Sequence, residues 1–127
     1  MGEQVEGPLF GEKTLQQIVG EQLSAVTFVM DYVQLAFDGP MINAYTWPTV
    51  HVGDRAFRRG DPSYRDELCA RVAIDVVAVR VPRDAIEIVF ADGTTIRISL
   101  RAEDLSEGAP EAAEFNGSHL VTFGPDD

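Results

Sequence analysis

The sequence predicts an α+β fold built from two pseudo-repeated units, each a helix followed by an antiparallel hairpin. Three observations carry this prediction: the chain matches itself when Leu15 is placed on Leu68, a helical apolar pattern opens each half, and alternating apolar strands follow it. The repeated apolar faces suggest one core shared by both units. The pattern leaves open whether the strands close into a barrel-like arrangement.

The self-match runs from Leu15 to Phe37 without an insertion. The identical pairs are Leu15 and Leu68, Val19 and Val72, Ala25 and Ala78, Val26 and Val79, Asp31 and Asp84, and Phe37 and Phe90. Between the identical pairs, apolar residues are also aligned with apolar residues, as Val33 is with Ile86. Because the strand alternation survives the shift, the match indicates an internal duplication.

Each unit is expected to begin with a helix. Thr14 and Gln17 form a Thr-x-x-Gln capping box, in which both side chains satisfy backbone N–H groups of the first turn. Gly20 lowers helix stability by about 1 kcal/mol relative to Ala, so the first helix is expected to end near it. The second helix is predicted over 63–72, because Pro62 suits a helix start and apolar residues follow at helical spacing.

Strands are predicted where apolar residues alternate with polar ones or form short runs between turn signals. The predicted strands are 25–30, 33–37, 41–47, 76–81, 86–90, 94–100 and 119–123. Asp92-Gly93 marks a tight hairpin, since Gly accepts the positive φ of such a turn. The single domain over 1–127 is thus divided into repeat one (about 14–47), a connection (48–62), repeat two (about 63–100) and an acidic C-terminal segment with the last strand (101–127).

Charge and cysteine content limit the classes of function that the chain could have. The chain has 21 acidic and 10 basic residues and a net charge of −11, which repels nucleic acid and anionic membranes and favours a basic protein partner. The apolar runs are too short to span a membrane, and no signal-peptide pattern opens the chain, so a cytoplasmic location is expected. With Cys69 as the single cysteine, no disulfide, no thiolate metal site and no cofactor are predicted.

The stretch 51–65 is rich in arginine and is a candidate anion site. Its candidate residues are Arg55, Arg58, Arg59 and Arg65. Guanidinium groups bind phosphate or carboxylate through paired N–H donors, which would suit a pocket near this stretch. The alternative is that the stretch only connects the two halves, and that its arginines pair with nearby acids and with the acidic C-terminal segment. The nearby acids are Asp54, Asp61, Asp66 and Glu67.

A second candidate surface is an interaction site. Its predicted residues are Trp47, Glu103, Glu107, Glu111 and Glu114. Residues 102–127 contain no Lys or Arg, so they suit a basic site on a partner, as in an immunity protein or an antitoxin that covers a toxin. Trp47 has the character of an interface anchor. The alternatives left open are solubility for the acids and core packing for Trp47, and homodimerisation through a strand edge fits either.

The sequence carries no catalytic pattern that we identify. His51 and His119 lack the spacing of a metal site, and no Gly-x-Ser-x-Gly elbow is present. The first hypothesis is therefore a non-enzymatic protein-interaction module. The alternative is a small-molecule or anion-binding protein, or an enzyme, with its pocket near 51–65.

Several short motifs lie at turns and strand ends. They are Val19-Gly20, Leu35-Ala-Phe-Asp-Gly39, Trp47-Pro48, Phe90-Ala-Asp-Gly-Thr-Thr-Ile-Arg-Ile98 and Pro110-Glu-Ala-Ala-Glu-Phe115. Together they resemble a bacterial, largely actinobacterial family of small duplicated proteins that is carried as a domain of unknown function. The resemblance covers about residues 19–123 and implies a shared fold, but neither an activity nor site residues.

Overall fold

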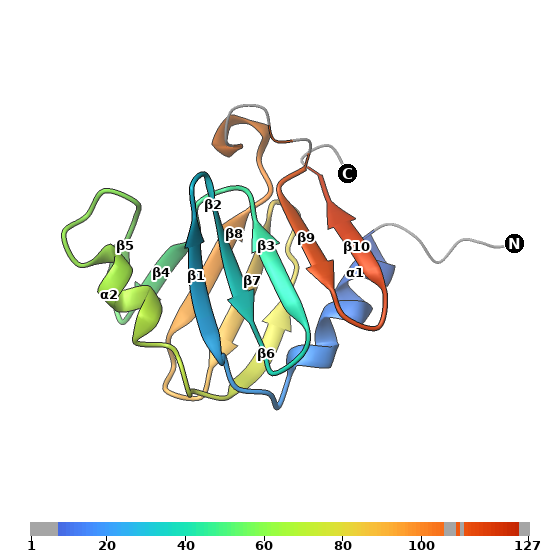
Figure 1. The fold of residues 1–127 in the computed structure, drawn as a ribbon, viewed down its shortest axis with the longest axis horizontal. Coiled ribbons are helices and arrows are strands. Elements are labelled where there is room, and N and C mark those ends of the chain that lie inside the picture. Colours follow the sequence, from blue (N-terminus) through green and yellow to red (C-terminus); the bar gives the residue numbers. More distant parts are fainter. Residues whose placement is uncertain (1–7, 106–108, 110, 125–127) are drawn as a thin grey trace, which may run out of the picture.

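Two five-stranded antiparallel sheets pack face to face, with short helices at the sides (Figure 1). The computed structural model describes residues 8–105, 109 and 111–124. The predicted α+β class is confirmed. The barrel-like arrangement is not found, because the two sheets stay separate and each keeps its own edge strands.

The sheets have different strand orders. Sheet 1 consists of β1 (Ala25–Val29), β2 (Tyr32–Ala36), β3 (Met41–Ala44), β9 (Ala113–Asn116) and β10 (Leu120–Phe123), in that order. Sheet 2 consists of β5 (Arg55–Phe57), β4 (Thr49–Val52), β8 (Thr95–Ser99), β7 (Ala85–Phe90) and β6 (Val76–Arg80), in that order.

The two halves of the chain exchange hairpins. The β4–β5 hairpin follows β3 in the chain, yet β4 pairs with β8 in sheet 2. The β9–β10 hairpin follows β8, yet β9 pairs with β3 in sheet 1. Each sheet therefore joins three strands of one half to two strands of the other, and the halves cannot separate without breaking backbone hydrogen bonds.

Helices cover both open sides of the sandwich (Figure 1). The α1 helix (Pro8–Leu15) and the 3-10 turn η1 (Gln16–Ile18) contact β10 and β6. The α2 helix (Tyr64–Cys69) contacts β1 and β4 on the opposite side, and a second 3-10 turn, η2 (Ala102–Asp104), follows β8. The Gln16 amide donates to the carbonyl of Val79 at 3.1 Å, which blocks part of the β6 edge against pairing with another chain.

The core lies between the sheets and follows from strand alternation. In β2 and β3, Val33, Leu35 and Ile42 face inward and are fully buried. In sheet 2, Ile88 and Ile96 do the same from paired positions of β7 and β8. Burial of one such side chain contributes about 1.5–3 kcal/mol to the free energy of unfolding. In the described part of the chain, no helix has the length and apolar character needed to cross a membrane.

Several predicted elements need correction. The first helix is Pro8–Leu15, so Thr14 lies near its end and the predicted capping box is wrong. The connection 48–62 was predicted without strands, but it contains β4 and β5, where Val50 and Phe57 pair and point into the core. The strand β9 was also not predicted. These strands are short, and their pairing partners lie far away in sequence, so local alternation is a weak signal for them.

A buried arginine ties the end of α2 to the β7–β8 hairpin. Arg71 is 6% exposed and lies 3.4 Å from the carboxylate of Asp92 and 3.5 Å from that of Glu67. Asp92 also accepts hydrogen bonds from the backbone N–H of Thr94 at 3.0 Å and from its hydroxyl at 2.6 Å. Burial raises the pKa of Asp92, but the Thr94 hydrogen bonds and the Arg71 charge outweigh it and lower the pKa overall. The hairpin is thus held by an ionised carboxylate.

Asp92→Asn is expected to lower the free energy of unfolding by about 1–2 kcal/mol, because it leaves the buried Arg71 with one weak ion pair. Because the pKa of Asp92 is lower in the folded than in the unfolded state, its contribution is complete above the unfolded pKa of about 4 and disappears as the pH falls through the folded pKa. Urea unfolding at pH 7 and at low pH measures this. Asp54→Asn, in the exposed β4–β5 turn, is the control, and an equal effect of both variants would contradict the assignment.

Candidate functional site

The outer face of sheet 1 gathers tyrosines, amides and one glutamate. Strand pairing sets Gln34 of β2 beside Asn43 of β3, and Asn43 beside Glu114 of β9. Next to this row, the rings of Tyr32 and Tyr45 lie 5.0 Å apart between centroids and are tilted by 47°. All five side chains are half-buried. We name these residues the tyrosine–glutamate face.

Hydrogen bonds orient Glu114 within the tyrosine–glutamate face. Its carboxylate accepts from the Asn43 amide at 3.0 Å and from the Tyr45 hydroxyl at 3.5 Å. Burial raises the pKa of Tyr45, and the charges of Glu114, Tyr32 and Glu111 raise it further. Two acidic side chains, Glu111 and Glu114, therefore act on the same hydroxyl. Tyr45 stays a neutral donor across the physiological pH range.

The exchange of hairpins gives sheet 1 a single sign of charge. The stretches 14–54 and 102–127 contain no Lys or Arg, and every strand of sheet 1 comes from one of them. Sheet 2, α2 and their loops carry all nine arginines of the chain. That set is Arg55, Arg58, Arg59, Arg65, Arg71, Arg80, Arg83, Arg97 and Arg101. The strands of sheet 1 therefore carry one acidic residue, Glu114, and no basic one, whereas the arginines lie with sheet 2 and α2.

The residues predicted for an interaction site fall in several places. Glu111 and Glu114 come together near Tyr45. Glu103 lies in η2, where it pairs with Arg101. Glu107 lies outside the described residues. Trp47 follows β3, is half-buried against the core, and lies beneath the guanidinium of Arg59 instead of on the tyrosine–glutamate face.

The four arginines predicted to bind an anion are stacked on aromatic rings or spread over loops. Arg55 lies 4.7 Å above the ring centroid of Phe57, Arg59 lies 4.2 Å above that of Trp47, and Arg65 lies 4.7 Å above that of Phe28. The backbone N–H of Arg58 donates to the carboxylate of Asp61 at 2.7 Å, within the loop before α2. Burial raises the pKa of Tyr64, and the charges of Arg59 and Arg65 oppose this increase.

Neither histidine lies in a metal site within the described residues, where no group of three His, Cys, Asp or Glu is placed to hold an ion. His51 of β4 is on the outer face of sheet 2. Burial lowers its pKa, and the charges of Arg97 and Arg58 lower it further, so the imidazole is mostly neutral at pH 7. His119 lies in the turn between β9 and β10, and Cys69 is exposed on α2.

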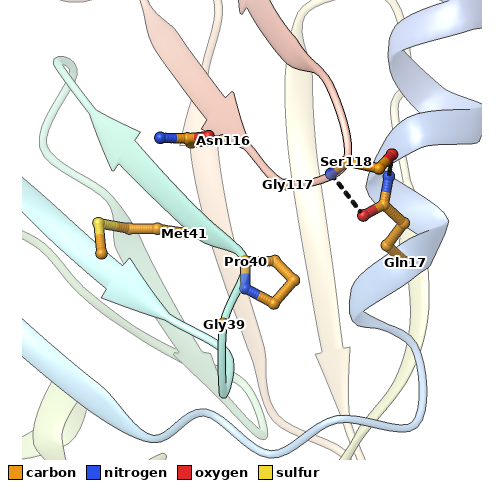
Figure 2. Close-up of a pocket in the computed structure, with 7 residues that line it drawn as sticks. All are labelled: Gln17, Gly39, Pro40, Met41, Asn116, Gly117 and Ser118. Atoms are coloured by element: carbon orange, nitrogen blue, oxygen red, sulfur yellow. Dashed lines mark hydrogen bonds between the residues drawn. The ribbon is translucent and has the colours of Figure 1, made fainter.

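An open depression lies beside the tyrosine–glutamate face, between the β2–β3 and β9–β10 turns (Figure 2). Its volume is about 340 Å³. Its lining residues are Gln17, Gly39, Pro40, Met41, Asn116, Gly117 and Ser118. In Figure 2 the Gln17 amide points at Ser118, where it donates to the hydroxyl at 2.6 Å and accepts from the backbone N–H at 3.0 Å.

The chemistry of this depression is neutral, because none of its lining side chains titrates. The Ser118 hydroxyl also lies 3.1 Å from His119 Nδ1, but both residues are exposed and adjacent on one turn, where such a contact orders the turn. Nucleophilic catalysis needs a base held by a further group and donors aimed at a developing oxyanion. The depression has neither among its lining residues, and it is distant in sequence from the stretch 51–65.

Comparison of the chain with protein-family models, with curated proteins and with solved structures finds no match. The candidate site therefore depends on its own geometry. The family resemblance noted above stays a prediction.

Sequence reasoning missed Tyr32, Gln34 and Asn43 as members of a site. The alternation of 41–47 does place Asn43 and Tyr45 on the face opposite Ile42 and Ala44, so their outward direction was readable. That Glu114 lies beside Asn43 was not readable, because the two residues meet through the β3–β9 pairing between the two halves.

Glu114→Gln is expected to lower the pKa of Tyr45, because it removes the nearest negative charge and weakens a hydrogen bond to the phenol. The measurement is an NMR titration of the Tyr45 ring, assigned with Tyr45→Phe. Glu103→Gln, which removes an acid from the distant η2 turn, should leave the titration unchanged. A Tyr45 pKa that is the same in Glu114→Gln and wild type would contradict the described contact.

Proposed function

We propose that this protein is a non-enzymatic interaction module whose tyrosine–glutamate face binds a basic protein partner. The observation that carries the proposal is the union, in one sheet, of the two stretches that lack Lys and Arg. Their acids cannot be neutralised by a basic residue of the same sheet. A partner that brings Lys or Arg to this face gains a complementary field and faster association.

The composition of the face supports binding to a protein. Tyrosine supplies large, rigid contact area with few torsions to immobilise, and amide side chains adapt their hydrogen bonds to the partner. Tyr32 and Tyr45 provide the first, and Gln34 and Asn43 provide the second. Glu114 is held in place by Asn43 and Tyr45, so less conformational entropy is lost when a partner's guanidinium or ammonium binds it.

An immunity-type or antitoxin-like role is the concrete form of this proposal. Such proteins place acidic groups over the basic, nucleic-acid-binding or catalytic surface of a toxin, and the complementary charge speeds association. Glu114 of the tyrosine–glutamate face, Glu111 near it and the two acids of η2 suit that task. The neutral lining of the depression supports a role without catalysis.

We also infer that the chain arose by duplication of one helix-plus-hairpin unit. The identities between Leu15 and Phe37 and their counterparts support this. The order of elements supports it too, since each half runs as helix, three-stranded meander and exchanged hairpin. The family of duplicated proteins that the motifs resemble has this expected plan, and membership of that family is part of the same proposal.

Glu114→Gln is expected to weaken binding of the basic partner by about tenfold, because one buried charged contact is worth 1–2 kcal/mol in such interfaces. The partner is first captured by a photo-cross-linking residue at Gln34, in the centre of the outer face of sheet 1. It is identified, produced alone and titrated calorimetrically at low and high salt. Binding should weaken as the salt concentration rises.

The matched control for cross-linking places the same photo-reactive residue at position 95, at the start of β8 on the outer face of sheet 2. The matched control for affinity is Glu87→Gln on that face, which removes the same charge. Capture through position 95 and not through position 34 would contradict the proposal. An acidic captured partner, or equal affinities for the two Gln variants, would contradict it as well.

The duplication predicts that β2 and β7 are interchangeable. A chimera in which residues 32–37 take the sequence of residues 85–90 should still unfold cooperatively, with a loss of about 1–3 kcal/mol from changed packing. The control carries the same residues shifted by one position, which turns every apolar side chain outward and should abolish the fold. Circular dichroism during urea unfolding measures both. A chimera as disordered as the control would refute the equivalence.

A further inference from the structure

Two arginines lie over aromatic rings in the region where a hydrogen bond from Tyr64 anchors α2. Arg59, in the loop before α2, covers the ring of Trp47, and Arg65, in α2, covers the ring of Phe28. The hydroxyl of Tyr64 donates to the carbonyl of Pro48 at 2.5 Å, which fixes the start of α2 against the start of β4. Burial raises the pKa of Tyr64, and the charges of both arginines oppose this increase. The hydrogen bond brings the two arginines to one region, because Arg59 covers Trp47, the neighbour of Pro48, and Arg65 follows Tyr64 in α2.

Neither arginine has an ion-pair partner within the described part of the chain. Other arginines do find carboxylates: Arg71 pairs with Asp92, and Arg97 pairs with Asp84 and Glu87. The chain has 21 acidic residues for 10 basic ones, so acids are abundant. The positive charges of Arg59 and Arg65 are therefore left available at the surface, although both side chains are held in place.

The stacking geometry suits a carboxylate. A guanidinium group that lies over a ring uses its flat face for the cation–π contact, and its N–H groups stay free in the plane of the group. Two parallel N–H donors match the two oxygens of a carboxylate. Because Trp47 and Phe28 already restrain the side chains, little conformational entropy is lost on binding. The half-buried rings add an apolar floor beside the donors.

We propose that Arg59 and Arg65, on the rings of Trp47 and Phe28, form a second binding site that takes an Asp- or Glu-bearing segment of a protein partner. Charge complementarity selects this occupant: both guanidinium groups are exposed and have no ion-pair partner among the described residues, so each attracts a carboxylate on a protein of net charge −11. The composition is that of an interface hot spot, in which Trp and Arg are enriched. A protein segment fits better than a free anion, because only a segment also covers the exposed parts of the rings.

This site lies apart from the tyrosine–glutamate face. It is built on α2, Trp47 and the β1 edge beside them, whereas the tyrosine–glutamate face uses the outward side chains of β2, β3 and β9. The two surfaces have opposite signs of charge. The protein thus has one site for a basic partner and a separate site for an acidic partner. This arrangement is that of an adaptor. The second site does not depend on the function proposed for the first.

Trp47 provides the measurement, because it is the only tryptophan of the chain and lies under Arg59. A blocked poly-glutamate peptide is titrated into the full chain at low salt, and the tryptophan fluorescence is recorded. We expect a saturable change that a poly-glutamine peptide does not cause. Arg59→Gln and Arg65→Gln should each lower the affinity for the peptide by about tenfold, since each removes one charged pair of donors. Arg80→Gln, on β6, removes the same charge elsewhere and should bind as wild type does.

Two further arms distinguish the possible outcomes. Arg59→Lys keeps the charge and loses the planar pair of donors, so it should bind the peptide more weakly than wild type. Inorganic phosphate should displace the peptide only at concentrations where sodium chloride of equal ionic strength does the same. Equal binding by wild type and both Gln variants would overturn the site, as would saturable binding of phosphate but not of the peptide. Unchanged circular dichroism spectra of the variants establish that a loss of binding is local.

Discussion

The pairing of β3 with β9 and of β4 with β8 is the constraint on which the rest of the structure depends. Through these two ladders, strands from each half of the chain complete the sheet that the other half begins. The backbone N–H and C=O groups of β3 and β8 would otherwise lie unpaired inside the molecule, at a cost of about 1–3 kcal/mol for each buried group. The single core follows from this exchange, because residues such as Ile42 and Phe115 become neighbours in register. Neither half can bury its apolar faces alone.

The same exchange distributes the charge. Sheet 1 combines two stretches without Lys or Arg, while arginines are confined to sheet 2, α2 and the neighbouring loops. Glu114 is half-buried in a sheet without basic residues, which costs electrostatic energy that a basic neighbour would offset. The cost is reduced because Asn43 and Tyr45 donate hydrogen bonds to Glu114. A half-buried glutamate that is ordered in this way fits the proposed binding role better than a role in solubility, which needs only exposed charge.

Local sequence patterns were sufficient for the longer strands and insufficient for their arrangement. The alternation in 33–37, 86–90 and 94–100 predicted β2, β7 and β8 to within two residues at each end, because each presents a complete apolar face. The short strand β9 was hidden in a stretch that reads as acidic and polar. The pairing of β3 with β9 and of β4 with β8 could not be predicted from the sequence. Turn residues indicate which consecutive strands form hairpins, but they carry no information about pairing between the two halves. For the site, Glu114 could be proposed from the sequence, but its grouping with Tyr32, Gln34 and Asn43 could not, for the same reason.

The stacking of arginines on aromatic rings is a consequence of this charge distribution. The acids that the sequence suggested as partners, such as Asp66 and Glu67, lie in α2, where Glu67 faces the buried Arg71. Arg59 and Arg65 lie over Trp47 and Phe28, and no carboxylate of the described residues pairs with them. An aromatic ring stabilises a cation by only about 0.5–1 kcal/mol at an exposed site, less than a good carboxylate pair in a bidentate geometry. A carboxylate that reaches these groups therefore adds to the cation–π contact without displacing it. Net charge alone suggests a protein that avoids acidic partners, whereas the geometry provides one surface that attracts them.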